Sequence, residues 1–163
     1  MAGPGVTYTG PVISGPIWNP GDLRGPVNTG LSLLAQTGTL VAAGASTVTF
    51  QFNLPSGSQI VDIIADTTVV WNSGTTDTLS VGLTAGGTDF ASGIPVGTGE
   101  VTPRQRPVYT AAQLAAQLVV GATPSNGVPV FATVTPVGTA ATAGSTTVTL
   151  VYIQTVQLLA GDA

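Results

Sequence analysis

The chain has 163 residues, of which only 6% are charged, and it contains no Lys, His or Cys. This length suits one β domain with its own core. The missing residue types exclude Ser-His and Cys-His nucleophiles, Schiff-base lysines and His- or Cys-ligated metals. Three arginines within a net charge of −4 argue against direct nucleic-acid binding, which needs several cations to neutralise phosphates.

The scarcity of charge also bears on the surface. Soluble monomers normally protect exposed strand edges with Lys, other charges or covering elements. We therefore expect partners to cover much of this surface; a monomer kept soluble by Thr, Ser, Asn and Gln is the alternative. The first residues carry no basic region followed by an apolar run, and no apolar run reaches about 18 residues, so neither a signal peptide nor a membrane helix is expected.

Residues 1–30 differ in composition from residues 31–163. Pro and Gly recur throughout this first segment, which argues against a helix or a central strand. Apolar side chains are nevertheless spaced along it, at Ile13, Ile17, Trp18 and Leu23. We interpret residues 1–30 as an extended arm that lies on a neighbouring subunit, and residues 31–163 as the folded domain. A solvated tail is the alternative.

The domain opens with strand patterns. Leu31–Val41 predicts one strand, or two short ones broken near Gly38. Ser46–Phe52 alternates apolar and polar residues, which is typical of a strand with one buried face.

The stretch from Leu54 to Phe90 predicts a β-meander. β-branched and aromatic residues up to Trp71 suit a half-buried strand. Asn72-Ser73-Gly74 is turn chemistry, and Leu79, Val81 and Leu83 then alternate with small or polar residues as a second strand does. Ala85-Gly86-Gly87 is expected to end that strand.

Residues 91–109 predict a loop-rich crossing, in which Arg104 and Arg106 would share a face if the chain is extended. Thr110 and Gln113 fit a capping box, so we expect a short helix over residues 111–118 with Leu114 and Leu118 on one face. Residues 128–134 predict another strand. Residues 146–159 predict a last strand that is apolar, and therefore covered, on both faces.

These elements predict an all-β fold: an antiparallel β-sandwich with jelly-roll or Greek-key connections, one short helix and the extended N-terminal arm. An up-and-down barrel is the alternative. A single helix argues against an α/β fold with parallel strands.

The remaining candidates for chemistry are weak, and we expect no catalysis, cofactor or metal. Asp62 and Asp66 would share a strand face about 13 Å apart, which exceeds the ~5–9.5 Å between paired glycosidase carboxylates. The oxygens of Asn72–Asp77 could hold an ion, although a plain turn explains them. Trp18 and Trp71 could form a ligand platform, or else lie buried in a core or subunit contact.

Four segments carry a resemblance to a known class of proteins. They are LPSGSQIVD at Leu54–Asp62, TTVVWN at Thr67–Asn72, TLSVG at Thr78–Gly82 and TDF at Thr88–Phe90. Together they resemble a run found in small β-rich structural proteins of tailed bacteriophages, many of which are head decoration (cement) proteins. Ser56 and Trp71 stand where Ala and Phe are commoner. The resemblance implies a virion structural protein, and the arm lies outside it.

The expected function is therefore decoration of a tailed-phage head. The protein would lie on the capsid surface and bind the major capsid protein and copies of itself, as a trimer or another local cluster, without touching nucleic acid or membrane. The residues expected to contact partners are the arm anchors Ile13, Ile17, Trp18 and Leu23, with Arg24, Arg104 and Arg106 pairing with partner carboxylates. A tail, neck or fibre component and a carbohydrate-binding module are the alternatives, and an enzyme comes last.

Overall fold

The computed structural model describes residues 33–44, 47–97, 103–121 and 127–154. The expected arm, residues 1–30, lies outside this range. The described residues form eight strands and one helix, in the order β1 (Leu33–Val41), β2 (Val48–Leu54), β3 (Gln59–Val69), β4 (Thr76–Gly82), β5 (Ala91–Pro95), β6 (Arg104–Gln105), α1 (Ala111–Gln117), β7 (Val128–Val137) and β8 (Ser145–Ile153).

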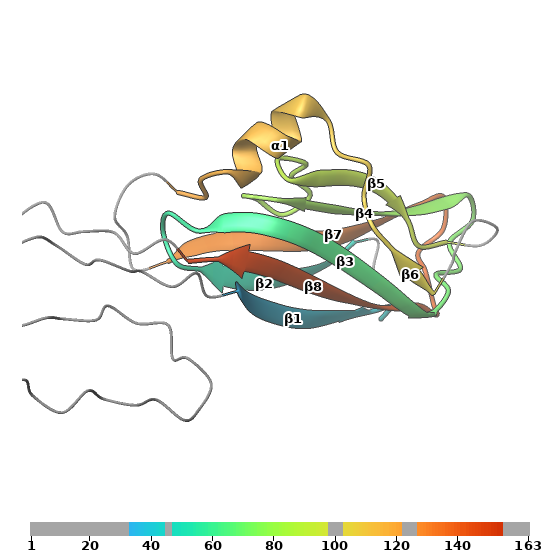
Figure 1. Ribbon diagram of the computed structural model, residues 1–163. Helices are drawn as coiled ribbons and strands as arrows, with labels where there is room; N and C mark the ends of the chain where they lie inside the picture. The colour runs from blue at the N-terminus through green and yellow to red at the C-terminus, as the bar shows by residue number, and fades with distance from the viewer. Residues whose placement is uncertain (1–32, 45–46, 98–102, 122–126, 155–163) are drawn as a thin grey trace, which may run out of the picture. The chain divides into compact units, whose positions relative to one another are not determined.

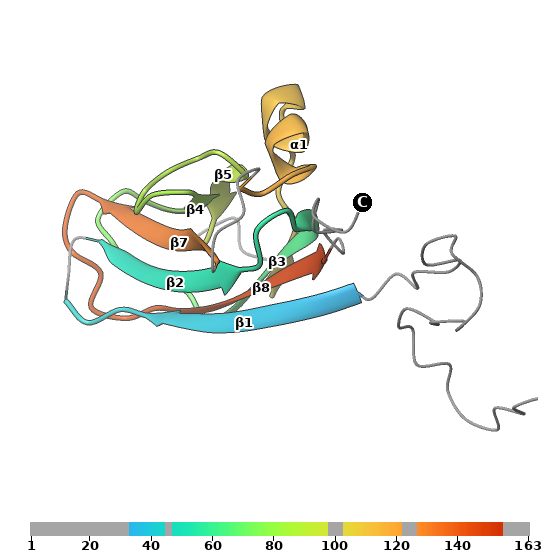
Figure 2. The same ribbon diagram turned by 90° about the vertical axis from the view of Figure 1, so that its left-hand side faces the viewer.

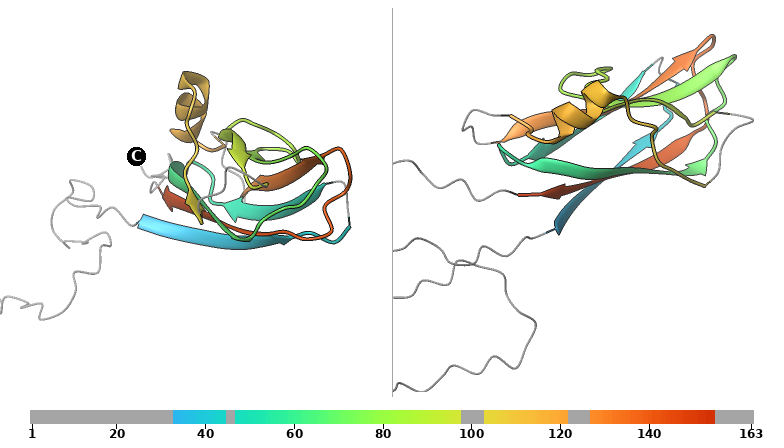
Figure 3. Two further views of the ribbon diagram at one scale, coloured as in Figure 1. Left: turned by 90° about the vertical axis from the view of Figure 1, so that its right-hand side faces the viewer. Right: turned by 45° about the horizontal axis from the view of Figure 1, so that its top comes forward.

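The strands form two four-stranded antiparallel sheets, ordered β1-β8-β3-β6 and β2-β7-β4-β5. The first strand thus pairs with the last, the second with the seventh, the third with the sixth and the fourth with the fifth. This is the nested pairing of one long hairpin rolled up into two sheets, which is a jelly roll. Figures 1, 2 and 3 show the sheets packed face to face. The predicted antiparallel sandwich is confirmed, and the barrel alternative is wrong.

The meander predicted for Leu54–Phe90 is wrong, because β3 and β4 belong to different sheets. The chain crosses between the sheets after β3, and Trp71 is buried at the crossing. Its backbone N–H donates to the Val96 carbonyl at 3.0 Å, and its indole N–H donates to Thr146 Oγ1 at 2.9 Å. Side-chain alternation identifies which face of a strand is buried but not which sheet the strand joins, so the sequence pattern fitted both arrangements.

The predicted loop over residues 91–109 is also partly wrong. It contains β5, which pairs with β4, and the two-residue β6, which pairs with β3. Both strands are short, and Gly93 in β5 has a left-handed backbone with φ of 67°. Such segments lack an alternation long enough to recognise, and their strand character comes from the neighbour that pairs with them.

The core lies between the sheets and draws inward-facing residues from both. β1 is one unbroken strand, so the alternative of a break near Gly38 is wrong. Glycine is required there by packing: a Cβ would lie 2.3 Å from two carbons of the Phe50 ring. That ring packs edge-to-face on Phe52, with centroids 4.9 Å apart. The last strand, predicted to run to Leu159, is described as β8 up to Ile153, with buried and half-buried residues in alternation.

We predict that Gly38→Ala destabilises the domain by about 1–3 kcal/mol, because the added methyl group overpacks the Phe50 contact. Chemical denaturation of both proteins measures the difference. In a Phe50→Leu background the same substitution should cost clearly less, since the clashing ring is gone. Equal costs in the two backgrounds would show that Gly38 has another role.

Candidate interaction surface

Helix α1 begins at the capping box that the sequence predicts. The backbone N–H of Gln113 donates to Thr110 Oγ1 at 3.2 Å, and the Thr110 N–H donates to Gln113 Oε1 at 2.9 Å. These bonds satisfy two of the N–H groups that every helix leaves unpaired at its start. The helix ends at Gln117 with Leu118 as its C-cap, in agreement with the predicted range.

Helix α1 contacts the domain through the buried Gln113 and Gln117 and the partly buried Ala116. Gln113 Nε2 donates to the Thr88 carbonyl at 3.0 Å and to Ser92 Oγ at 3.1 Å. One turn later, Gln117 Nε2 donates to the Phe90 carbonyl at 2.8 Å. Both glutamines are buried. Two amide side chains four residues apart therefore fasten the helix to the segment that leads into β5.

The apolar face of α1 points to solvent. Leu114, Leu118 and Val119 are 50%, 58% and 55% exposed. We call these three residues the α1 patch. A surface helix of a globular protein normally turns its apolar stripe inward, so this orientation is the reverse of the usual one. The patch contains no charged residue, and the sequence has none from Pro107 to Gly121.

Other exposed apolar residues gather at the same end of the sandwich as α1. Val120, just after the patch, bridges to Ser58 beside the start of β3. In the first sheet Leu33 pairs with Ile153, which pairs with Gln59. The exposed Leu33 and Val61 therefore lie at this end, which we call the α1 end. Figure 2 shows α1 above the end of the sandwich where β1 begins.

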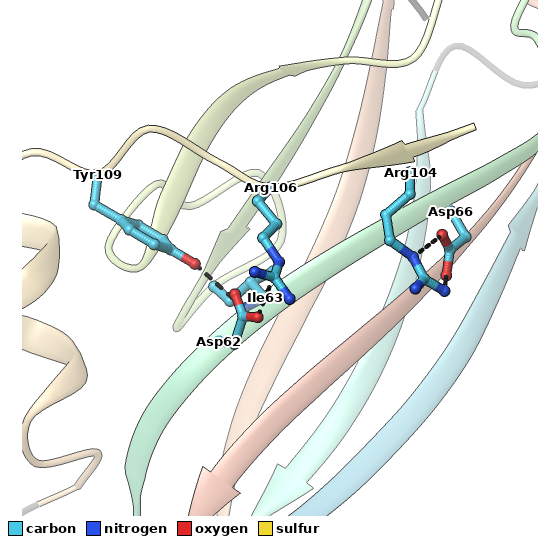
Figure 4. Close-up of polar contacts among 6 residues, drawn as sticks. All are labelled: Asp62, Ile63, Asp66, Arg104, Arg106 and Tyr109. Carbon is cyan, nitrogen blue, oxygen red and sulfur yellow. Dashed lines mark hydrogen bonds and ion pairs between the residues drawn. The ribbon is translucent and has the colours of Figure 1, made fainter. Parts of the chain in front are cut away.

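Arg104 and Arg106, predicted to pair with partner carboxylates, have acids of their own chain beside them. Arg104 binds Asp66 with two hydrogen bonds, from Nε at 2.7 Å and from Nη2 at 3.0 Å, and Arg106 Nε lies 3.2 Å from Asp62 Oδ2. Figure 4 shows both pairs across the β3–β6 edge. In the antiparallel pairing of β3 with β6, Asp66 lies directly opposite Arg104, which brings the two side chains together. Pairing with a partner's carboxylates stays a prediction.

Two side chains near the β3–β6 edge, Asp66 and Tyr109, have shifted pKa values. The hydrogen bonds from Arg104 hold the pKa of Asp66 below its ordinary value of 3.8. Burial raises the pKa of Tyr109 above 10.0, and the Tyr109 hydroxyl accepts a hydrogen bond from the Ile63 N–H at 3.2 Å. Asp66 and Asp62 each lie beside a guanidinium group of the same chain. The two ion pairs fix the short β6 strand against β3.

Several other predicted features are placed by the structure. Trp71 is buried and so cannot form a ligand platform. In the Asn72–Asp77 turn, Asn72 Oδ1 accepts backbone N–H groups of Thr142 and Ala143, and Asp77 Oδ2 accepts that of Ser73. Those oxygens therefore organise the turn. The predicted contacts Ile13, Ile17, Trp18, Leu23 and Arg24 lie outside the described residues.

The described residues show neither a metal-ligand cluster nor a membrane-spanning helix. Among residues 33–44, 47–97, 103–121 and 127–154, no three His, Cys, Asp or Glu side chains are grouped as metal ligands. The helix in this part of the chain is too short to cross a membrane. Comparison of the chain with models of protein families, with curated proteins and with solved structures found no match.

We predict that the buried amides, and not the leucines, hold α1 in place. Gln117→Met should lower the free energy of unfolding by about 1–3 kcal/mol, because the buried Phe90 carbonyl loses its donor. Leu114→Gln, on the exposed face, should change it by about 0.5 kcal/mol or less. Urea denaturation compares the two, and a larger effect of the leucine substitution would contradict the inverted orientation.

We also predict that the Asp66 carboxyl titrates below 3.8 and that Arg104→Gln moves its pKa upward toward that value. Because the folded-state pKa is the lower one, the stabilisation from this pair is present at neutral pH and is lost as the pH falls through the folded-state pKa. NMR titration of the Asp66 side-chain carbonyl measures the shift. Arg106→Gln is the control and should leave the Asp66 pKa in place.

Proposed function

We propose that this protein is a structural virion protein that decorates and stabilises the head of a tailed bacteriophage by bridging neighbouring capsid subunits, without catalysis. The observation that carries the proposal is the α1 end. Helix α1, fastened by two buried glutamines, and the residues just after it present Leu114, Leu118 and Val119 to solvent, at the same end of the sandwich as the exposed Leu33 and Val61. A lone soluble domain gains nothing from that orientation, whereas a domain seated on a partner buries the patch.

The energetics suit attachment in many copies. Fully burying a Leu or Val side chain contributes about 1.5–3 kcal/mol, and covering the exposed half would contribute roughly half of that. The α1 patch alone therefore supplies only a few kcal/mol per copy. A multimer that engages several sites on a shell at once multiplies such modest contacts through effective concentration. This supports binding to an assembled head more than binding to a single free protein.

The charge distribution also favours binding through apolar contacts. Arg104 and Arg106, two of the three cations in the sequence, pair with acids of the same chain. Long-range electrostatic steering would therefore contribute little to partner choice. Apolar shape complementarity and backbone contacts would determine the choice of partner instead. The partners would be the major capsid protein and further copies of this chain, in a trimer or another local cluster on the virion surface.

The phage assignment draws on the resemblance over Leu54–Phe90. The jelly roll agrees with it, since capsid domains use this topology, but lectin domains and cupins use it as well. The arm, with Ile13, Ile17, Trp18 and Leu23 as anchors and Arg24 as a partner for carboxylates, would add contacts across the seam between capsomers. Residue 33, which follows this segment, lies at the α1 end.

A tail, neck or fibre component is the second candidate within the same class. The number of copies per particle separates the two, because hundreds indicate decoration and a few indicate the neck or tail. For the carbohydrate-binding alternative, Trp71 cannot serve as the platform for a sugar, because its side chain is buried.

The test is binding of purified protein to phage heads that lack it, measured by co-sedimentation. We expect the double variant Leu114→Ser/Leu118→Ser to reduce head affinity at least tenfold, and deletion of residues 1–30 to reduce it further. The matched control is Val69→Ser/Val137→Ser, which removes exposed apolar residues from the opposite end of the sandwich and should bind as the parent does. Unchanged affinity of both the patch variant and the deletion would refute the proposal.

A further inference from the structure

Three of the four sheet edges in the described part of the chain carry features that block pairing with another strand. β6 is two residues long and is flanked by the ion pairs of Arg104 and Arg106. β5 has five residues, with an irregular register against β4, a left-handed Gly93 and Pro95 at its end. Short length, charge, irregularity and proline are the devices by which proteins protect sheet edges.

The third edge, β2, is engaged by a side chain at one position near its end. Gln36 Nε2 donates to the Asn53 carbonyl at 2.7 Å, and the Asn53 backbone N–H donates to Gln36 Oε1 at 3.3 Å. The side-chain amide thus takes both backbone positions that an added strand would use at Asn53. Because Gln36 belongs to β1, this contact also connects the two sheets where their edge strands β1 and β2 lie.

The fourth edge, β1, has none of these protections. It runs for nine residues, LLAQTGTLV, in unbroken register with β8, and it contains no charged residue and no proline. On its other side no strand pairs with it within the described residues. Figure 1 shows β1 at the margin of its sheet, beside β8. Leu33 and Val41, at its two ends, are 63% and 56% exposed. Such an edge is a template for an additional strand.

We propose that β1 pairs antiparallel with β1 of a second copy across a two-fold axis at Thr37, which joins two four-stranded sheets into one of eight strands. The sequence of β1 is self-complementary about that residue. Leu33 would lie opposite Val41, Leu34 opposite Leu40, Ala35 opposite Thr39, and Gln36 opposite Gly38. Each apolar residue larger than alanine therefore meets another, and the inward-turned Gln36 meets a residue without a side chain.

A second copy is favoured as the occupant because two-fold pairing closes on itself. The same edge serves both chains, so no new unpaired edge is created and no fibre grows. At the axis the two copies of Thr37 meet, and no like charges oppose each other anywhere along the strand. This inference concerns free protein and does not depend on attachment to a phage head, so the failure of one proposal leaves the other intact.

The chain has no cysteine, which makes cross-linking a direct test. Opposite residues of antiparallel strands have Cα atoms about 4.5–5.5 Å apart, within the range that a disulfide spans. The single variant Thr37→Cys should therefore form a covalent dimer under mild oxidation at micromolar concentration. Thr135→Cys, at an exposed position of β7 in the other sheet, is the control and should stay monomeric on a non-reducing gel. Equal cross-linking of the two variants would overturn the proposal.

A charge exchange tests the axis without oxidation. Thr37→Lys and Thr37→Glu should each abolish the dimer in sedimentation velocity, since like charges would lie directly opposite each other. An equimolar mixture of the two should restore a dimer of twice the monomer mass. A parent protein that is monomeric at 100 µM, or whose oligomer survives both substitutions, would overturn the proposal. So would an edge that cross-links only after residues 1–30 are deleted, because the arm of the same chain would then be its occupant.

Discussion

Packing of the two sheets against each other is the constraint on which the rest of the structure depends. The chain has few charges and no disulfide to add stability, so its fold relies on the apolar residues between the sheets. Two positions show how close that packing is. Gly38 leaves room for the Phe50 ring, and Trp71 fills the crossing from β3 to β4 while its indole N–H reaches Thr146. Strands β1 to β4 alternate between the two sheets, β5 pairs with β4 in the same sheet, and β6, β7 and β8 alternate again, which gives the jelly-roll path.

On the surface, polar and charged side chains are used for contacts within the domain. Helix α1 is fastened by Gln113 and Gln117, whose amides donate to the carbonyls of Thr88 and Phe90, and the buried Phe90 carbonyl needs such a donor. With its polar face used in this way, the helix has only its leucine face left to show to solvent. The charged groups are similarly committed, since Arg104 and Arg106 hold the short β6 strand against β3. Within the described residues, the apolar α1 patch and the uncharged β1 edge are the surfaces that we propose for partners.

These two features would serve an assembly protein at different scales. The α1 patch is small and rigid, and it lies at one end of the sandwich, where it suits repeated attachment to a surface. The β1 edge offers backbone hydrogen bonds and a self-complementary strand, which suit pairing between copies. Neither feature contains a charged residue, in keeping with the 6% of charged residues in the sequence.

The sequence by itself determined the β class, most strand positions and the start of α1, because alternation and capping are local patterns that depend on neighbours a few residues away. Only the tertiary structure decided which sheet each strand joins, that residues 91–95 and 104–105 are strands, and which face of α1 turns inward. Hydrophobicity would have buried Leu114 and Leu118. Gln113 and Gln117 are buried instead because the carbonyls of Thr88 and Phe90 and the hydroxyl of Ser92 lie beneath them, more than twenty residues earlier in the chain. Hydrogen-bond partners that distant leave no trace in a local pattern.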